Sequence, residues 1–191
     1  TGVVYLYQFD DSNFTNATLK GRIGKGLSGG LNIDLNVDVN GDIMVGKQDK
    51  FGRSLSFDST GKLLVVGAPG DDGSTTEGVD ANLNKEAGAV YLITFDDTSY
   101  DNGQIVGVIG AGYNRSNTKD VNLLNQGVTN GPVIEASDLF GMGVALDGDA
   151  DVLAVGVYYD QGFNERNTKI KKSGSVFMLA FDDTDFSGGK A

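Results

Sequence analysis

The chain contains no cysteine and no histidine among its 191 residues, and only two prolines. Without cysteine it can form no disulfide, no thiolate nucleophile and no cysteine-ligated metal centre. Without histidine it lacks the side chain that most often acts as a general base or binds a metal at neutral pH. Serine–histidine–aspartate triads, cysteine–histidine pairs and histidine zinc sites are therefore excluded.

Positive charge is also scarce, because 15 basic residues face 26 acidic ones and give a net charge of −11. Nucleic acids and anionic lipid surfaces both select a cationic footprint, so we expect neither as a partner. No run of 18 apolar residues is present, and we expect no membrane insertion. The first residue is Thr1 rather than methionine, so we expect a processed product or part of a longer protein.

One segment is present three times at a constant spacing of 86 residues, in residues 2–11, 88–97 and 174–183. Each copy is a β-branched and aromatic run, with a glycine before it and two aspartates after it. Such runs between turn signals predict strands, here at 3–9, 89–95 and 175–181. A repeat of this length predicts units that bury their apolar faces against their neighbours.

Further strands are predicted from shorter patterns. Two hairpins are expected, one formed by strands 53–57 and 62–68 and the other by strands 142–147 and 152–158. Short apolar strands are also expected at 17–23 and 104–109, each after a pair of aspartates. The second hairpin lies 89 residues after the first, whereas residues 34–37 align with residues 120–123 at the spacing of 86. Residues 31–40 alternate strictly between apolar and polar, which is typical of either a half-buried strand or an extended rim segment. No helical period is sustained anywhere, so helix should be nearly absent.

The repeat resembles the FG-GAP family, the bacterial and integrin-α type of β-propeller blade. The residues that carry the resemblance are Phe51-Gly52-Arg53-Ser54-Leu55-Ser56-Phe57-Asp58, Leu64-Val65-Val66-Gly67-Ala68-Pro69 and Gly88-Ala89-Val90-Tyr91-Leu92. The next copy keeps Phe140-Gly141 but has Gly156-Val157-Tyr158 in place of Gly-Ala-Pro.

The resemblance implies an all-β fold of antiparallel four-stranded blades of β-propeller type, in about two repeats of 86–89 residues. Residues 1–50 would hold the last two strands of one repeat and a connecting extended segment. Residues 51–139 would form a complete central blade with a long connection, and residues 140–191 the first three strands of the next blade. The incomplete sheets at both ends would then have exposed edges.

The family also often carries a calcium loop after its Phe-Gly strand, which here corresponds to residues 58–62 and 147–151. The first loop has one carboxylate and a lysine, as in a plain turn. The second offers Asp147, Asp149 and Asp151 at alternate positions, and three carboxylates suit a hard cation with oxygen ligands. This loop is shorter than the family's and lacks its final acidic ligand. A calcium site and a solvated acidic turn are both open, and calcium is the only cofactor suggested.

The expected function is a secreted or cell-surface binding or adhesion module without catalytic residues. Paired aspartates repeat with the strands, and repetition at a turn indicates a structural role. Loops on one rim would contact an extracellular protein or glycan, namely residues 70–87, 112–139 and 157–173. The alternative is a structural subunit of an extracellular fibre or matrix, joined to further copies through strand complementation at its ends. In either case we expect residues 3–9 and 175–181 to form buried strands.

Overall fold

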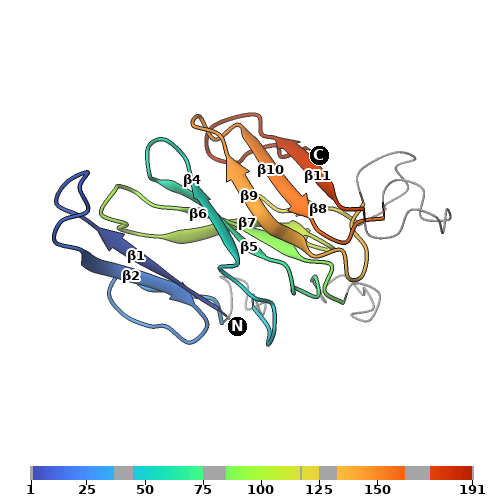
Figure 1. Ribbon diagram of the computed structural model, residues 1–191, viewed down its shortest axis with the longest axis horizontal. Coiled ribbons are helices and arrows are strands. Elements are labelled where there is room, and N and C mark those ends of the chain that lie inside the picture. The colour runs from blue at the N-terminus through green and yellow to red at the C-terminus, as the bar shows by residue number, and fades with distance from the viewer. Residues whose placement is uncertain are drawn as a thin grey trace.

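The computed structural model describes residues 2–36, 45–74, 85–116, 118–124, 133–161 and 173–190. These residues form eleven β-strands and no helix, which confirms the all-β prediction. The strands make three sheets, none of them closed, with the central sheet between the other two (Figure 1). No helix in the described part of the chain could span a membrane.

The N-terminal sheet has the order β1-β2-β3. Its strands are β1 (Val3–Gln8), β2 (Thr18–Gly24) and β3 (Ile33–Asp34). β1 pairs antiparallel with β2, whereas β3 returns along β2 in the parallel direction.

The central sheet has five strands in sequence order. They are β4 (Ser54–Phe57), β5 (Leu63–Ala68), β6 (Ala89–Thr94), β7 (Gln104–Gly110) and β8 (Val121–Asn122). The first four form an antiparallel meander, and β8 lies parallel to β7.

The C-terminal sheet has the order β11-β10-β9 and is antiparallel throughout. Its strands are β9 (Phe140–Leu146), β10 (Val152–Val157) and β11 (Ser175–Ala180). The sequence thus predicted the position of each long strand to within one or two residues, because each combines β-branched residues with a turn signal.

The repeat is visible in the hydrogen-bond register. Tyr5 pairs with Arg22 in the N-terminal sheet, and Tyr91 pairs with Val108 in the central sheet. Both ladders shift register at the same repeat position, after Leu6 in one and after Leu92 in the other. The 86-residue spacing therefore holds through β1 and β2.

The short strands β3 and β8 correct one alignment. Gly24 pairs with Asp34 and Gly110 pairs with Asn122, so these strands correspond at a spacing of 88 rather than 86. A slip of two residues leaves every side chain on the same face, so the apolar–polar alternation could not reveal it. Within 31–40 the strand covers only Ile33–Asp34, and residues 37–40 lie outside the described residues.

One hydrophobic core lies on each face of the central sheet. Val90 and Leu92 of β6 belong to the core shared with the C-terminal sheet. Tyr91 and Ile93 belong to the core shared with the N-terminal sheet. Because neighbouring side chains of a strand point to opposite faces, β6 is buried on both sides.

The end strands are less buried than expected. β1 and β11 form as predicted, and each is an edge strand of its sheet, but they do not pair with each other. β1 exposes Tyr5 (55%) and β11 exposes Met178 (58%). The prediction of buried strands was wrong for the outward-facing side chains, because among the described residues each end sheet has a neighbouring sheet on one side only.

Candidate functional site

The long connections all leave one end of the sheets. β5 ends at Ala68, which pairs with Ala89, and β7 ends at Gly110, which pairs with the same residue. In the C-terminal sheet Val157 pairs with both Ser175 and Phe140. We call this end the loop-bearing rim; its described parts are residues 25–32, 45–53, 69–74, 85–88, 111–116, 133–139, 158–161 and 173–174.

The rim joins the central and C-terminal sheets directly. Phe140 donates its N–H to the carbonyl of Ala87, and Leu139 donates to Glu86. The loops predicted to contact a ligand, 70–87, 112–139 and 157–173, all start or end on this rim. Residues 75–84, 117, 125–132 and 162–172 of these loops lie outside the described residues.

Asp71 is the most buried acid of the rim, with 2% of its surface exposed. It accepts hydrogen bonds from the hydroxyls of Tyr91 at 2.7 Å and Tyr113 at 2.8 Å, and from the N–H of Gly73 at 2.8 Å. Burial and the nearby charge of Asp49 raise the pKa of Asp71 to about 7, against the lowering effect of these hydrogen bonds.

Three further buried acids extend this arrangement: Asp49, Asp138 and Asp160. The carboxylate of Asp49 accepts from the N–H of Gly46, and the carboxylate of Asp138 accepts from the N–H of Glu135. Their carbonyls accept from Gly70 and Tyr159 respectively. Burial raises the pKa of both Asp49 and Asp138, in the latter case to about 6.

Hydrogen bonds of these acids join the residues where the long loops begin and end, next to the strands. The carbonyl of Asp71 accepts from Gly88, so the residues that open and close the connection from β5 to β6 are bonded to each other. The carbonyl of Asp160 accepts from Gly174 in the same way, while its carboxylate accepts from the hydroxyl of Ser175. This network was not predicted from the sequence. Its signal is the spacing of 89 from Asp49 to Asp138 and from Asp71 to Asp160, which the two Phe-Gly pairs also show.

The opposite end of the sheets carries short turns built around the repeated aspartates. The carboxylate of Asp11 accepts from the N–H groups of Asn13 and Thr15. Asp97 and Asp183 make the same two bonds in their turns. The bond from Thr15 N–H lowers the pKa of Asp11. These acids hold turns, which supports the structural interpretation of their repetition.

The three acids of the possible calcium loop lie at this turn end. Asp147 Oδ1 accepts from Val152 N–H at 3.0 Å, and this bond lowers the pKa of Asp147. A hydrogen bond with Asp147, together with the charge of that group, raises the pKa of Asp151. In the described part of the chain no group of three acidic side chains is arranged to hold a metal ion. The calcium site stays a prediction.

Asp58 occupies the position in the first hairpin that Asp147 occupies in the second. Burial opposes its ionisation, but hydrogen bonds from Thr60, Leu63 and Lys62 outweigh burial and lower its pKa. Val152 follows Asp147 by five residues, as Leu63 follows Asp58, so the two aspartates hold their hairpins through the same N–H. Asp149 instead lines a polar cavity of about 620 Å³ between the two hairpins, together with Lys62, Lys119 and Asp185.

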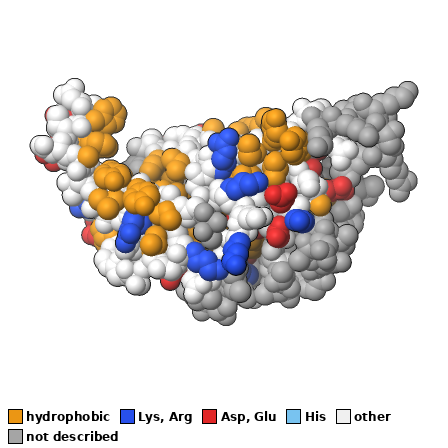
Figure 2. Space-filling model, turned by 60° about the horizontal axis from the view of Figure 1, so that its bottom comes forward, with side chains coloured by type: hydrophobic (Ala, Val, Ile, Leu, Met, Phe, Trp, Pro, Cys, Tyr) orange, Lys and Arg blue, Asp and Glu red, His pale blue; other side chains and the backbone are white. Residues whose placement is uncertain are grey.

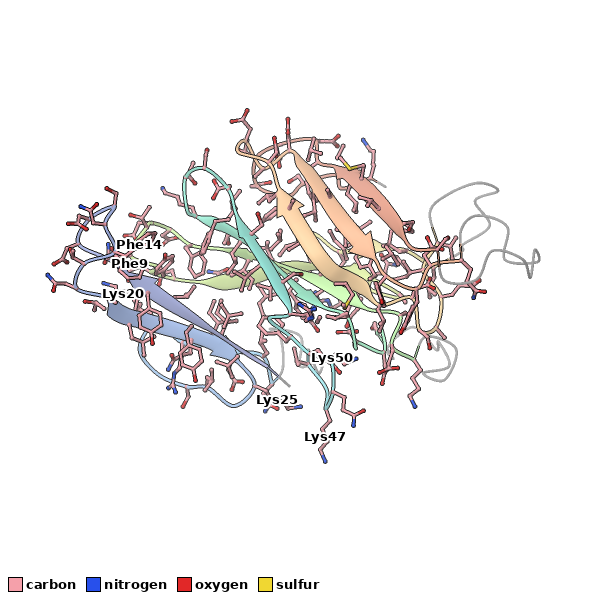
Figure 3. All side chains as sticks on the ribbon, viewed as in Figure 1. Phe9, Phe14, Lys20, Lys25, Lys47 and Lys50 are labelled. Carbon is pink, nitrogen blue, oxygen red and sulfur yellow. The ribbon has the colours of Figure 1, made fainter. Side chains whose placement is uncertain are left out.

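The N-terminal sheet adds an aromatic and basic surface. Hydrophobic side chains gather in patches on its side of the molecule, the left in Figures 1 and 2. Phe9 and Phe14 stack edge to face at the turn end, with ring centroids 5.2 Å apart. Lys25, Lys47 and Lys50 lie toward the loop-bearing rim (Figure 3), where Lys25 Nζ donates to the carbonyl of Val45 and Lys50 pairs with Glu86.

No protein-family model matches the chain, and no curated protein matches it. The resemblance to FG-GAP repeats therefore rests on the quoted residues alone.

The described acids of the site are hydrogen-bonded within the protein. Asp71 is buried and accepts from its two tyrosines, and its raised pKa is of a kind that is also found in catalytic acids. The acids of the short turns are occupied by backbone N–H groups. Loops whose roots are fixed on a rigid sheet are instead a common arrangement for binding.

Proposed function

We propose that the chain is a non-catalytic binding or adhesion module of β-propeller type that acts outside the cell or on its surface. Its ligand is an extracellular protein or glycan, held by the loop-bearing rim. The observation that carries this proposal is the asymmetry of the sheets: the long connections leave one end, and their roots are bonded through Asp71 and Asp160.

The strand arrangement supports the β-propeller part of the proposal. β4 to β7 form one antiparallel meander of four strands, which is the composition of a propeller blade. Neighbouring sheets pack face to face through apolar side chains. The resemblance to FG-GAP repeats supplies the extracellular adhesive role.

The test is binding of the 191-residue chain to arrays of extracellular matrix proteins and of neutral and acidic glycans, with calcium or with EDTA. Two variants replace residues 75–84 or 162–172 by glycine–serine segments of the same length. Matched control variants carry Asn13→Ala or Thr184→Ala at the short turns. We expect binding that the loop replacements abolish and the controls retain.

The opposite results would overturn the proposal. These are no binding to any array member, or binding that both loop replacements leave intact. The triple variant Asp147→Asn, Asp149→Asn, Asp151→Asn tests the calcium hypothesis separately. Calcium binding measured by calorimetry should disappear in this variant if those carboxylates hold the ion, and retained binding would refute the assignment.

A further inference from the structure

Within the described residues, each end sheet has one apolar face that no other sheet covers. The N-terminal outer face consists of exposed large side chains on β1, β2 and the turn between them: Val3, Tyr5, Tyr7, Phe9, Phe14 and Leu19. The C-terminal outer face is formed by Val176 and Met178 of β11, which are 65% and 58% exposed. The end sheets lie on opposite sides of the central sheet (Figure 1), and these faces point away from it because the opposite face of each end sheet belongs to a core.

The N-terminal outer face repeats a surface that is covered in the central sheet. Tyr5 and Tyr7 occupy the repeat positions of Tyr91 and Ile93, which lie in the core between the N-terminal and central sheets. The other four residues correspond in the same way to Ala89, Phe95, Tyr100 and Ile105, all in or against that core. In that core, the residues of the central sheet are packed with others that include Val4 and Leu6 of β1.

The C-terminal outer face carries the repeat positions that cover the corresponding surface inside the chain. Val176 and Met178 occupy the positions of Val4 and Leu6, and also those of Val90 and Leu92. The latter two pack in the core that contains Leu179 and borders Phe177 of the C-terminal sheet. Successive copies of this strand therefore share a hydrophobic core twice inside the chain. The two surfaces that could form this packing once more are both exposed, one on the N-terminal sheet and one on the C-terminal sheet.

The two outer faces also have complementary shapes, since one adjoins a cavity and the other presents exposed aromatic rings. A cavity of about 550 Å³ adjoins the C-terminal outer face and is lined by Met142, Gly156, Tyr158 and Val176. The N-terminal outer face instead presents the rings of Tyr5 and Tyr7. A hollow apolar surface next to exposed rings is the pairing that gives dense packing at an interface.

We propose that the C-terminal outer face of one copy binds the N-terminal outer face of a second copy, head to tail. Met178 and Val176 then contact Tyr5 and Tyr7 of the second copy, as Leu6 and Val4 share a core with Tyr91 and Ile93 within one chain. The contact joins two different surfaces, so it propagates into a line or a ring rather than a closed symmetric dimer. It is a contact between sheet faces, in contrast to strand complementation at sheet edges.

Sedimentation velocity over a range of concentrations tests the proposal. The wild-type chain should increase in mass with concentration. Tyr5→Asp or Met178→Asp alone should weaken self-association by about 10-fold or more, because each places a charge at the centre of an apolar contact. Leu55→Asp is the matched control, since Leu55 is 50% exposed but lies on β4 of the central sheet.

Mixing the two variants identifies the geometry. Tyr5→Asp retains an intact C-terminal outer face and Met178→Asp an intact N-terminal one, so an equimolar mixture should form heterodimers and nothing larger. A monomeric wild type at all concentrations would overturn the proposal. So would loss of association in only one of the two variants, which indicates a symmetric contact, or failure of the mixture to form dimers. Circular dichroism of each variant confirms that the sheets remain folded.

Discussion

Strand β6 lies between two sheets. β1 and β11 carry the same repeated segment, but in the part of the chain that the structure describes they have a sheet on one side only. β6 has side chains buried on both faces, while β1 and β11 alternate between covered and exposed positions. Ile93 is fully buried and its counterpart Tyr7 is 45% exposed. The comparison shows that the repeated segment specifies a strand, and that the neighbouring sheets decide how much of the strand is buried.

A close approach between the central and C-terminal sheets provides a sensitive test of the difference between the central sheet and the end sheets. A methyl group at Gly67 of β5 would lie 2.1 Å from the carbonyl oxygen of Gly141 in the next sheet. At Gly156, the equivalent residue of β10, the nearest atoms would be 3.7 Å away. Gly67→Ala should therefore lower the free energy of unfolding by about 4 kcal/mol or more, above the usual range for overpacking because a backbone atom cannot move aside.

Gly156→Ala is the control for that substitution and should change the free energy of unfolding by less than about 0.5 kcal/mol. Urea denaturation of both variants supplies the measurement. Equal effects of the two substitutions would mean that the close contact between the central and C-terminal sheets is absent in solution.

Ile93 and Tyr7 test the two faces of the repeated strand. Ile93→Ala removes a fully buried side chain and should destabilise the protein by about 3 kcal/mol, within the range for such truncations. Tyr7→Ala removes a larger but half-exposed side chain and should cost less than about 1 kcal/mol. Denaturation at a concentration where the chain is monomeric makes the comparison, and a larger effect at Tyr7 would contradict the order of the sheets.

These comparisons show what the sequence could predict. The long strands were recognisable because their β-branched runs end at Asp-Asp or glycine turns. The register of β8 was not, because a two-residue slip keeps Val121 and Leu123 on the same face. Sequence alone also could not tell that Tyr91 is covered and Tyr5 is not, since both are tyrosines in the same pattern. The buried acids were missed because an aspartate after a strand is also what a solvated turn contains.

The rim acids predict how stability depends on pH. Asp71 has a pKa of about 7 in the folded protein, against an ordinary value of 3.8. Between these values the folded protein keeps a proton that the unfolded chain releases, so stability falls as the pH rises from about 4 to 7. Below about pH 4, stability falls again as acids with lowered pKa, such as Asp58 and Asp11, become protonated. Maximal stability is therefore expected near pH 4 to 5.

Asp71→Asn should remove about 3 kcal/mol of the change in stability between pH 4 and 7. The amide carries no charge and keeps one oxygen as an acceptor. Because the hydroxyls of Tyr91 and Tyr113 bond to different oxygens of Asp71, one of them would accept from the amide N–H₂ group instead. Asp138→Asn, in the segment that leads into the C-terminal sheet, should have a smaller effect that is complete by about pH 6. Melting temperatures of the three proteins over this range test the assignment. An unchanged pH profile in Asp71→Asn would show that this carboxylate is not the group that titrates.

The smallest expected effect concerns an aromatic pair that is present in all three sheets. Phe9–Phe14, Phe95–Tyr100 and Phe181–Phe186 each pack edge to face, with centroids 5.2, 5.3 and 5.2 Å apart. The second ring of each pair belongs to a residue with positive φ, at 59°, 65° and 68°. The geometry is thus constant, although Phe14 is 74% exposed and Phe186 is fully buried.

Double-mutant cycles with leucine at both positions separate the ring–ring interaction from burial. The single substitutions should cost more in the Phe181–Phe186 pair than in the Phe9–Phe14 pair, because only the former lies in a core. The coupling energy should be similar in both cycles, at about 0.5–1 kcal/mol, since it depends on ring geometry rather than on the neighbouring sheet. A coupling confined to Phe181–Phe186 would show instead that the exposed turn of the N-terminal sheet needs a covering partner to adopt this geometry.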